Sequence, residues 1–512
     1  MGTLAVGPQL LAKRMARFSR YHYVPLFFLI YLSCSYDLWP QRNNPRNCVI
    51  NRDACTIDEN CNFITQACEP GGLALLSVSP PAGPTSGGIQ IKLTGRKFMP
   101  GAVVRIAGQP AAPVQFVSDK ELNVVLPSNP TAFGPAEIVI ENPDGSIVRN
   151  SDLFHYFVTN FSFSTTRTTV QPVIADMAAA DVNRDGNLDL ILCQETAGSI
   201  AVYLGDGRGN FADRRTSTVG FGISRLGLGD FNQDGALDLA VLSVIRSNIS
   251  TMLSNRDGTF SLHQSVAVTS SPAALLVGRF DGDDFNDVFV TDSSAGQLHR
   301  LFGNGTGTLT AAAPIDLMLT SFELGGYDMD GDGTVDFVLS SLAGQRVAVL
   351  QGDRSNATSI KGRQDWILPG YHPYTAAVGD FNKDGRNDFV SGSILNNTLH
   401  SVFANESGQY IERDTHSLGS GFAGPSFCRA FDLNGDGLLD ILCSDSFSPN
   451  LALLLGNGLV GFSAPIVIPT EDMNSMDSSK FAVGDFDRNG KPDLVFISTS
   501  STQFTVMLNQ SF

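Results

Sequence analysis

The sequence is poor in basic residues and lacks the groupings that would mark a catalytic site. It holds 34 Lys and Arg against 51 Asp and Glu, and its net charge of −17 argues against nucleic acid as a partner. Its seven histidines are scattered, without the spacing of metal ligands and without a nucleophile motif nearby. We therefore expect no catalytic residues and a protein that is not an enzyme.

The N-terminal region also lacks an apolar run long enough to cross a bilayer. The run from Val24 to Leu32 has nine residues, whereas a spanning helix needs roughly 20. Basic residues precede this run, which predicts an export signal at residues 1–34. Cys34 follows Tyr31-Leu32-Ser33, which resembles a lipoprotein cleavage site except for its tyrosine. A lipid anchor at Cys34 and a plain secretion signal both remain open, and both predict an extracellular or cell-surface protein.

One nine-residue pattern, rich in carboxylates, organises most of the chain. Its clearest copy, residues 328–336, has aspartate at positions 1, 3, 5 and 9 and glycine at position 6. Ca2+ takes roughly six to eight oxygen ligands, and alternating aspartates can turn several carboxylates toward one ion. The glycine permits a sharp bend, and the carbonyl of Thr334 at position 7 would add a backbone oxygen. The pattern predicts a calcium loop.

The same loop recurs at a nearly constant interval. Its first positions are 49, 49, 49, 52, 52 and 53 residues apart, at Asp181, Asp230, Arg279, Asp328, Asp380, Asp432 and Asp485. A fixed period of this length is typical of solenoids and propellers. Apolar runs flank each loop and glycine-rich turns separate further runs, so each unit predicts four strands. Seven units predict an all-β fold with a seven-bladed β-propeller at residues 158–512.

The seventh unit is short of one strand. Its last apolar run, residues 504–508, is followed by only four residues. A spare strand-like segment with no loop of its own lies at residues 161–167. We expect this segment to complete the last blade, which would remove an open sheet edge.

Six of the seven loops carry a near-complete set of oxygen ligands at positions 1, 3, 5 and 9. The sets are Asp181, Asn183, Asp185 and Asp189; Asp230, Asn232, Asp234 and Asp238; Asp328, Asp330, Asp332 and Asp336; Asp380, Asn382, Asp384 and Asp388; Asp432, Asn434, Asp436 and Asp440; and Asp485, Asp487, Asn489 and Asp493. Clustered carboxylates without a cation raise each other's pKa at a cost in stability. We therefore expect about six structural Ca2+ ions.

The third loop departs from this pattern. Arg279 replaces the first aspartate, and Asp284 replaces the glycine of position 6. We expect the guanidinium of Arg279 to pair with Asp281, Asp283 and Asp287 in place of the metal. This loop should then hold no Ca2+.

The cysteines suit an exported protein better than a zinc protein. Four of them lie within a tether and cysteine-rich segment at residues 35–72, without C-x-x-C spacing and without histidine, at Cys48, Cys55, Cys61 and Cys68. Two disulfides of open connectivity are expected there. Cys428 and Cys443 flank the sixth loop on strands that should be neighbours, which is compatible with a disulfide and would leave Cys193 as a buried free thiol.

The repeat units resemble FG-GAP/VCBS repeats, which form the calcium-loop propellers of integrin α-subunits and of many bacterial surface proteins. Upstream, the segment from Val78 to Gly88 is rich in proline and glycine and leads into the alternating apolar residues Ile89, Ile91 and Leu93. This segment resembles the start of an IPT/TIG domain. The resemblance implies an immunoglobulin-like sandwich at residues 73–157, of a kind that acts as a spacer or interaction domain.

By its resemblance to integrin-like propellers, the protein is expected to be an exported, calcium-stabilised binding or adhesion protein. A protein or carbohydrate ligand would meet the propeller face opposite the calcium loops. Candidate contacts lie in the loops between units, at Tyr371, His372, Tyr374, Phe422, Glu471 and Asp472. Two alternatives remain open: a polysaccharide lyase or hydrolase built on such a propeller, and a passive envelope scaffold. The enzyme would need convergent acidic and basic residues in the central channel.

Overall fold

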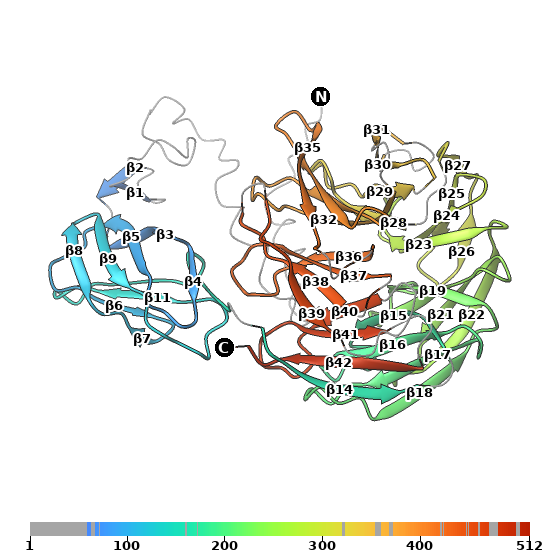
Figure 1. Cartoon of the computed structure of the whole chain (residues 1–512), viewed down its shortest axis with the longest axis horizontal. Helices are drawn as coiled ribbons and strands as arrows, with labels where there is room; N and C mark the ends of the chain where they lie inside the picture. The colour runs from blue at the N-terminus through green and yellow to red at the C-terminus, as the bar shows by residue number, and fades with distance from the viewer. Residues whose placement is uncertain are drawn as a thin grey trace, which may run out of the picture.

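The computed structural model describes residues 59–62, 67–70 and 72–511, with gaps at 159–160, 171–172, 320–322, 342, 354–359, 368–371, 420–421, 423, 447, 449, 459–460, 471–479 and 498–501. All the regular secondary structure in this part of the chain is β-strand (Figure 1), which confirms the predicted all-β class. No helix suited to crossing a membrane occurs there. The expected export signal with Cys34, the residues Cys48 and Cys55, and the predicted contacts Tyr371, Glu471 and Asp472 lie outside the described residues.

The cysteine-rich segment contributes one hairpin. It consists of β1 (Glu59–Asn62) and β2 (Ala67–Pro70), and its register places the backbone of Cys61 opposite that of Cys68.

A β-sandwich follows. One sheet has the order β3 (Ala74–Ser79), β5 (Gln90–Arg96), β9 (Glu121–Val125) and β8 (Val114–Ser118). The other has the order β12 (Ile147–Asn150), β11 (Ile138–Glu141), β6 (Val103–Ile106) and β7 (Gln109–Pro110). The short strands β10 (Gly134–Pro135), β13 (His155–Phe157) and β4 (Ala82–Pro84) form a third sheet. Alternate apolar residues are buried together, among them Ile91, Leu93, Leu122, Ile138 and Ile140.

Seven antiparallel sheets make up the rest of the described chain. Their first strands are β15 (Ile174–Ala180), β19 (Ile223–Gly229), β23 (Pro272–Gly278), β28 (Glu323–Tyr327), β32 (Pro373–Gly379), β36 (Pro425–Phe431) and β40 (Lys480–Gly484). The second strands are β16 (Asp189–Gln194), β20 (Asp238–Ser243), β24 (Asp287–Asp292), β29 (Asp336–Ser341), β33 (Asp388–Ser393), β37 (Asp440–Asp445) and β41 (Asp493–Ile497).

The third and fourth strands follow the second in each sheet, and the fourth forms the sheet's far edge. The third strands are β17 (Ser199–Leu204), β21 (Asn248–Ser254), β25 (Gln297–Gly303), β30 (Arg346–Gln351), β34 (Thr398–Ala404), β38 (Asn450–Leu454) and β42 (Gln503–Asn509). The fourth strands are β18 (Asp213–Thr218), β22 (Phe260–Ala267), β26 (Leu309–Ala311) with the short β27 (Ile315–Asp316), β31 (Gly362–Ile367), β35 (Tyr410–Ser417), β39 (Ile466–Pro469) and β14 (Phe163–Thr169).

The apolar core is divided among the spaces between neighbouring sheets. Ile191 and Val202 of the first of these sheets, for example, pack with Leu239 and Val241 of the second. Every residue of β16 and of β20 is buried, which explains why these strands are continuous apolar runs rather than alternating ones. Each fully buried Leu, Ile or Val contributes about 1.5–3 kcal/mol, so most of the stability comes from these contacts between sheets.

The sheets surround a common centre. First strands of successive sheets contact each other, from β15 round to β36, and β40 contacts β15. Between β36 and β40, the rings of Phe427 and Phe481 lie 5.0 Å apart. The spare strand β14 pairs along its whole length with β42, far away in the sequence, as Figure 1 shows in teal and red. This pairing confirms the prediction that residues near 161–167 complete the last sheet.

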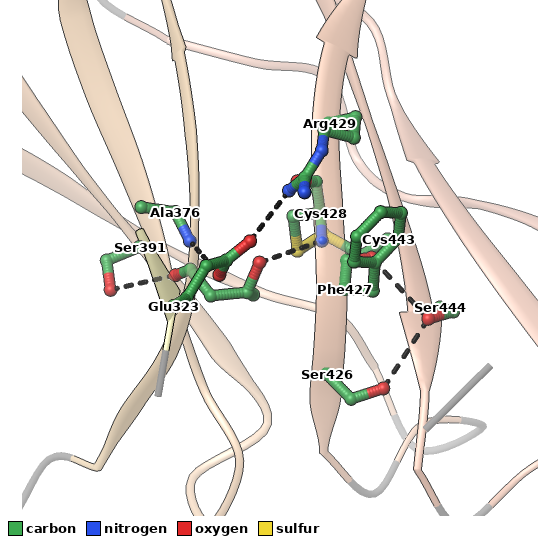
Figure 2. Close-up of a disulfide and its surroundings, with 10 residues drawn as sticks. Glu323, Ala376, Ser391, Ser426, Phe427, Cys428, Arg429, Cys443 and Ser444 are labelled. Atoms are coloured by element: carbon green, nitrogen blue, oxygen red, sulfur yellow. Dashed lines mark hydrogen bonds and ion pairs between the residues drawn. A yellow bond between two sulfur atoms is a disulfide. The ribbon is translucent and has the colours of Figure 1, made fainter. Parts of the chain in front are cut away.

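The sixth sheet is cross-linked by a disulfide between Cys428 of β36 and Cys443 of β37 (Figure 2). These residues are directly opposite in the strand register, and their Cα atoms lie 4.1 Å apart. Both are fully buried. Cys193 is a buried free thiol, as expected.

Candidate metal loops

The ninth residue of each loop is a buried aspartate that connects two backbone segments. In the fifth loop, Asp388 accepts a hydrogen bond from the N–H of Phe381 (3.2 Å) and another from the N–H of Ala404 (2.8 Å), one on each carboxylate oxygen. The equivalent two bonds are made by Asp189, Asp238, Asp287, Asp336, Asp440 and Asp493. The ninth residue therefore has a structural role whether or not it also contacts a metal.

Burial perturbs the titration of these groups. It raises the pKa of every ninth-position carboxyl, and the neighbouring loop carboxylates raise it further. The pKa reaches about 7 at Asp287, Asp388, Asp440 and Asp493 and about 6 at Asp336. A nearby cation would favour the charged form and reverse this shift.

The first residue of the loop holds the turn from inside. Asp380 accepts hydrogen bonds from the N–H groups of Asp384 (3.0 Å) and Gly385 (2.8 Å). The bond from the position 6 glycine recurs at 2.8–2.9 Å on Asp181, Asp230, Asp328, Asp432 and Asp485. Arg279 has no oxygen acceptor for this bond, so the third loop is built differently.

Position 4 of the loop requires a left-handed backbone conformation, which was not predicted from the sequence. Its φ is positive in all seven loops, at Arg184, Gln233, Gly282, Gly331, Lys383, Gly435 and Arg488. A side chain in this left-handed region costs roughly 1–2 kcal/mol, which explains why three of the loops use glycine there. Those three glycines were the available signal. Position 6 is also left-handed wherever glycine occupies it.

The donor set fits Ca2+, a cation that prefers carboxylate and carbonyl oxygens. Carboxylate oxygens lie within 4.8 Å of one another in the fourth loop (Asp328, Asp330, Asp332) and in the seventh (Asp485, Asp487, Asp493). In the loops with asparagine at position 3, its amide nitrogen donates to the position 5 carboxylate, as Asn382 does to Asp384 (3.2 Å). Metal binding there would replace this hydrogen bond by coordination of the amide oxygen.

The expected role of Arg279 is wrong. Its guanidinium lies 3.8 Å from the carboxylate of Asp284, on the outside of the loop, where both side chains are exposed. Asp281, Asp283 and Asp287 converge within 4.8 Å of one another without it. Asp287 is buried, so pairing with it would strip water from the guanidinium. Pairing with the exposed Asp284 leaves the guanidinium hydrated.

Comparison with known families agrees with this geometry. A model described as FG-GAP-like repeat matches residues 181–241, 328–391 and 400–496, and one described as IPT/TIG domain matches residues 74–156. This is an FG-GAP-like repeat protein with an IPT/TIG domain. The first two matched repeat segments begin at the first residue of a loop, Asp181 and Asp328, so the loops belong to the family pattern.

Solved structures with similar chains share low identity with this FG-GAP-like protein. BBS1N in complex with ARL6DN is 11 % identical, with 69 % of this chain and 96 % of that chain covered and a TM-score of 0.45. An auxiliary nutrient binding protein from Bacteroides ovatus is 11 % identical, with coverage of 86 % and 99 % and a TM-score of 0.39. A Lactobacillus plantarum protein is 13 % identical, with coverage of 65 % and 94 % and a TM-score of 0.44. No curated protein matches the chain.

The sixth loop of the FG-GAP-like region is also the junction with the IPT/TIG domain. The N–H of Val158 donates to the carbonyl of Asn434 (3.0 Å), and Asn434 is buried. A Cβ on Gly437 would lie 2.9 Å from the ring of His155, so the two backbones approach closely. Burial raises the pKa of both Asp432 and Asp436. A cation in this loop would brace the domain junction as well as the repeat.

The three predicted contact residues that the structure describes, His372, Tyr374 and Phe422, do not form one exposed group. Phe422 is 6 % exposed and packs in the core between the fifth and sixth sheets, so its expected surface role is wrong. Its loop is held inward because the aromatic ring gains more from apolar burial than from exposure. Tyr374 is partly buried and lines a central cavity, and His372 is also partly buried.

Proposed function

We propose that this protein is an exported, calcium-stabilised, non-enzymatic binding or adhesion protein, and that its seven sheets are the blades of one closed β-propeller. FG-GAP-like repeats and IPT/TIG domains are typical of extracellular or surface proteins. The Cys428–Cys443 disulfide supports export, because disulfides persist mainly in oxidising compartments.

Exposed apolar side chains on one face carry this proposal. The metal loops connect first to second strands, so the loops between units and the turns from second to third strands lie at the opposite end. Phe221, in a loop between units, is 62 % exposed, and Ile245, in the neighbouring turn, is 72 % exposed. The N–H of Val244 donates to the carbonyl of Gly222 (3.0 Å), which holds these two segments together. Exposed aromatic and aliphatic side chains of this kind anchor ligands.

Ca2+ has a structural role in this proposal. In each of six loops, one bound ion would be coordinated by the oxygens at positions 1, 3 and 5 and would neutralise their charge. The protein contributes the turn itself, through the backbone hydrogen bonds to the first and ninth residues. Because the loops lie at one end of the sheets, the opposite face stays available for a protein or carbohydrate ligand.

The acidic side chains of the central cavity favour binding over catalysis. Asp176 is paired with Lys480 and Glu323 with Arg429, and each carboxylate also accepts a backbone N–H. Both carboxylates are therefore already engaged in ion pairs and backbone hydrogen bonds, which leaves neither of them placed to exchange a proton with a substrate. A polysaccharide lyase or hydrolase is therefore the weaker proposal.

The test is ligand capture on glycan and extracellular-protein arrays by the calcium-loaded protein. Wild type should bind a ligand that the double variant Phe221→Ser, Ile245→Ser does not bind. Leu262→Ser is the matched control, because Leu262 is 51 % exposed but lies on the outer strand β22. Equal loss in the control would contradict the assigned face, and no ligand on either array would favour a passive scaffold. Cleavage of acidic polysaccharides would overturn the non-enzymatic assignment.

A further inference from the structure

The first strands of the repeat sheets surround a cavity of about 380 Å3. Five charged side chains from five different sheets line it: Asp176, Arg225, Glu323, Arg429 and Lys480. A volume of this size is within the usual range for small-molecule sites, roughly 300–1,000 Å3. Burying several charged groups in one cavity costs free energy unless each group is paired with an opposite charge or hydrogen-bonded.

Four of the five charges are paired. Lys480 Nζ lies 2.6 Å from Asp176, and Arg429 lies 2.8 Å from Glu323. The second pair joins β28 of the fourth repeat sheet to β36 of the sixth, beside the disulfide (Figure 2). Both carboxylates have a second role, because Asp176 accepts the N–H of Leu226 (3.0 Å) and Glu323 accepts that of Ala376 (3.1 Å). These acidic groups are thus engaged in holding adjacent sheets together.

Arg225 is the cation in excess. Its guanidinium donates to the carbonyl of Ser224 (2.8 Å), and no carboxylate of the described chain forms an ion pair with it. Three cations and two carboxylates leave one positive charge over in the cavity. A guanidinium offers five N–H donors in a planar fork, so most of its donors remain available for an anion.

The rest of the cavity wall is largely apolar. Arg429 stacks on Phe427, with its guanidinium carbon 3.9 Å from the ring centroid, and Phe481 packs against the same ring. Leu226 and Leu275 also line the cavity. The Arg429 side chain is 38 % solvent-accessible, so its guanidinium can also be approached by a ligand.

We propose that this cavity binds a small organic carboxylate. The carboxylate pairs with Arg225, within the field of Arg429 and Lys480, and the ligand's apolar body lies against the phenylalanine and leucine side chains. Planar guanidinium groups recognise carboxylates through two parallel hydrogen bonds, which gives orientation as well as affinity. The site is separate from the exposed face proposed for the macromolecular ligand, so either proposal can fail alone.

Benzoate is the probe that tests this proposal, and benzamide is its neutral counterpart. Titration of the full chain in calcium-containing buffer at constant ionic strength should show saturable benzoate binding to one site per chain. Benzamide should bind about tenfold more weakly or worse, because it lacks the charge. Arg225→Met should weaken benzoate binding by about tenfold or more without lowering the melting temperature. Arg215→Met is the matched control, since Arg215 lies on the outer strand β18 and pairs with Asp213.

A cavity-filling variant, Ala178→Phe, tests the location of the site independently, because Ala178 lines the same cavity. It should abolish binding while the protein remains folded. The proposal is overturned if wild type shows no saturable benzoate binding up to about 10 mM. It is equally overturned if benzamide or the Arg225→Met variant matches wild type, or if inorganic phosphate binds and carboxylates do not.

Discussion

Replacing the carboxylate at the ninth loop position should destabilise the protein with or without calcium. Replacing the one at the fifth position should destabilise it strongly only when calcium is present. Asp388 is fully buried and its two oxygens accept two backbone N–H groups, those of Phe381 and Ala404. Asp388→Ala leaves both donors buried without a partner. Each orphaned donor costs about 1–3 kcal/mol, so the expected loss is about 2–6 kcal/mol.

Asp384 of the same loop is the matched control. It is exposed, and its carboxylate contacts only residues of its own loop. It accepts hydrogen bonds from the N–H of Arg386 (2.9 Å) and the amide of Asn382 (3.2 Å), and it forms a surface ion pair with the Arg386 guanidinium (3.5 Å). In chelator, Asp384→Ala should therefore cost less than about 1 kcal/mol. In millimolar calcium it should cost more, because the variant loses one ligand of the ion and with it part of the binding free energy.

The assay is urea unfolding of wild type and both variants, each in chelator and in millimolar calcium. A large loss for Asp388→Ala in both buffers, with a loss for Asp384→Ala only in calcium, would support the division of roles. If the two variants lost equal stability in chelator, the ninth residue would have no separate structural role. If neither responded to calcium, the loop would be a turn without a metal.

Other predictions follow from the loops and the disulfide. In chelator, the unfolding temperature should fall as the pH rises from about 4 to about 7. Asp287, Asp388, Asp440 and Asp493, with a pKa of about 7, and Asp336, with a pKa of about 6, keep their protons in the folded state over this range, whereas in the unfolded chain they lose them near the ordinary pKa of 3.8. A flat profile would contradict the raised pKa values. Elemental analysis of calcium-equilibrated protein should find about six ions per chain, and chelation should lower the melting temperature; a full set of seven would show that the third loop also binds. Gln233 has a φ of 57° and already bears the roughly 1–2 kcal/mol cost of a side chain in the left-handed region, so Gln233→Gly should raise the urea midpoint, whereas the β-branched Gln233→Val should lower it; equal urea midpoints would contradict the conformational argument. Replacing Cys428 and Cys443 with alanine should cost about 3 kcal/mol, measured by the same unfolding assay, for a cross-link that spans 15 residues.

Local spacing in the sequence was enough to predict much of this architecture. Each loop lies between its predicted strands because carboxylates, glycine and the following apolar run are all within nine residues or next to them. The pairing of β14 with β42 was also predictable, since one repeat lacked a strand and one strand lacked a repeat. These inferences use only the period and the strand signal, so they needed no knowledge of side-chain contacts.

Contacts between distant residues were not predictable in the same way. The partner of Arg279 depends on which side of the loop its side chain lies, and the burial of Phe422 depends on the space between two sheets. The central charges did leave one signal that was overlooked. Four of them stand exactly five residues before a loop, at Asp176, Arg225, Glu323 and Lys480. That common repeat position places these four side chains on the same face of their respective first strands.

The pairing of β14 with β42 has a consequence for how the chain folds. The first six repeat sheets each draw their strands from one continuous segment, so each can form soon after its segment leaves the ribosome. β14 must wait, because its partner is made more than 330 residues later. Until then its edge is unsatisfied and open to wrong partners, a known source of kinetic traps in large β-proteins. Pairing of β14 with β42 should thus be the slow, late event in the folding of the repeat sheets.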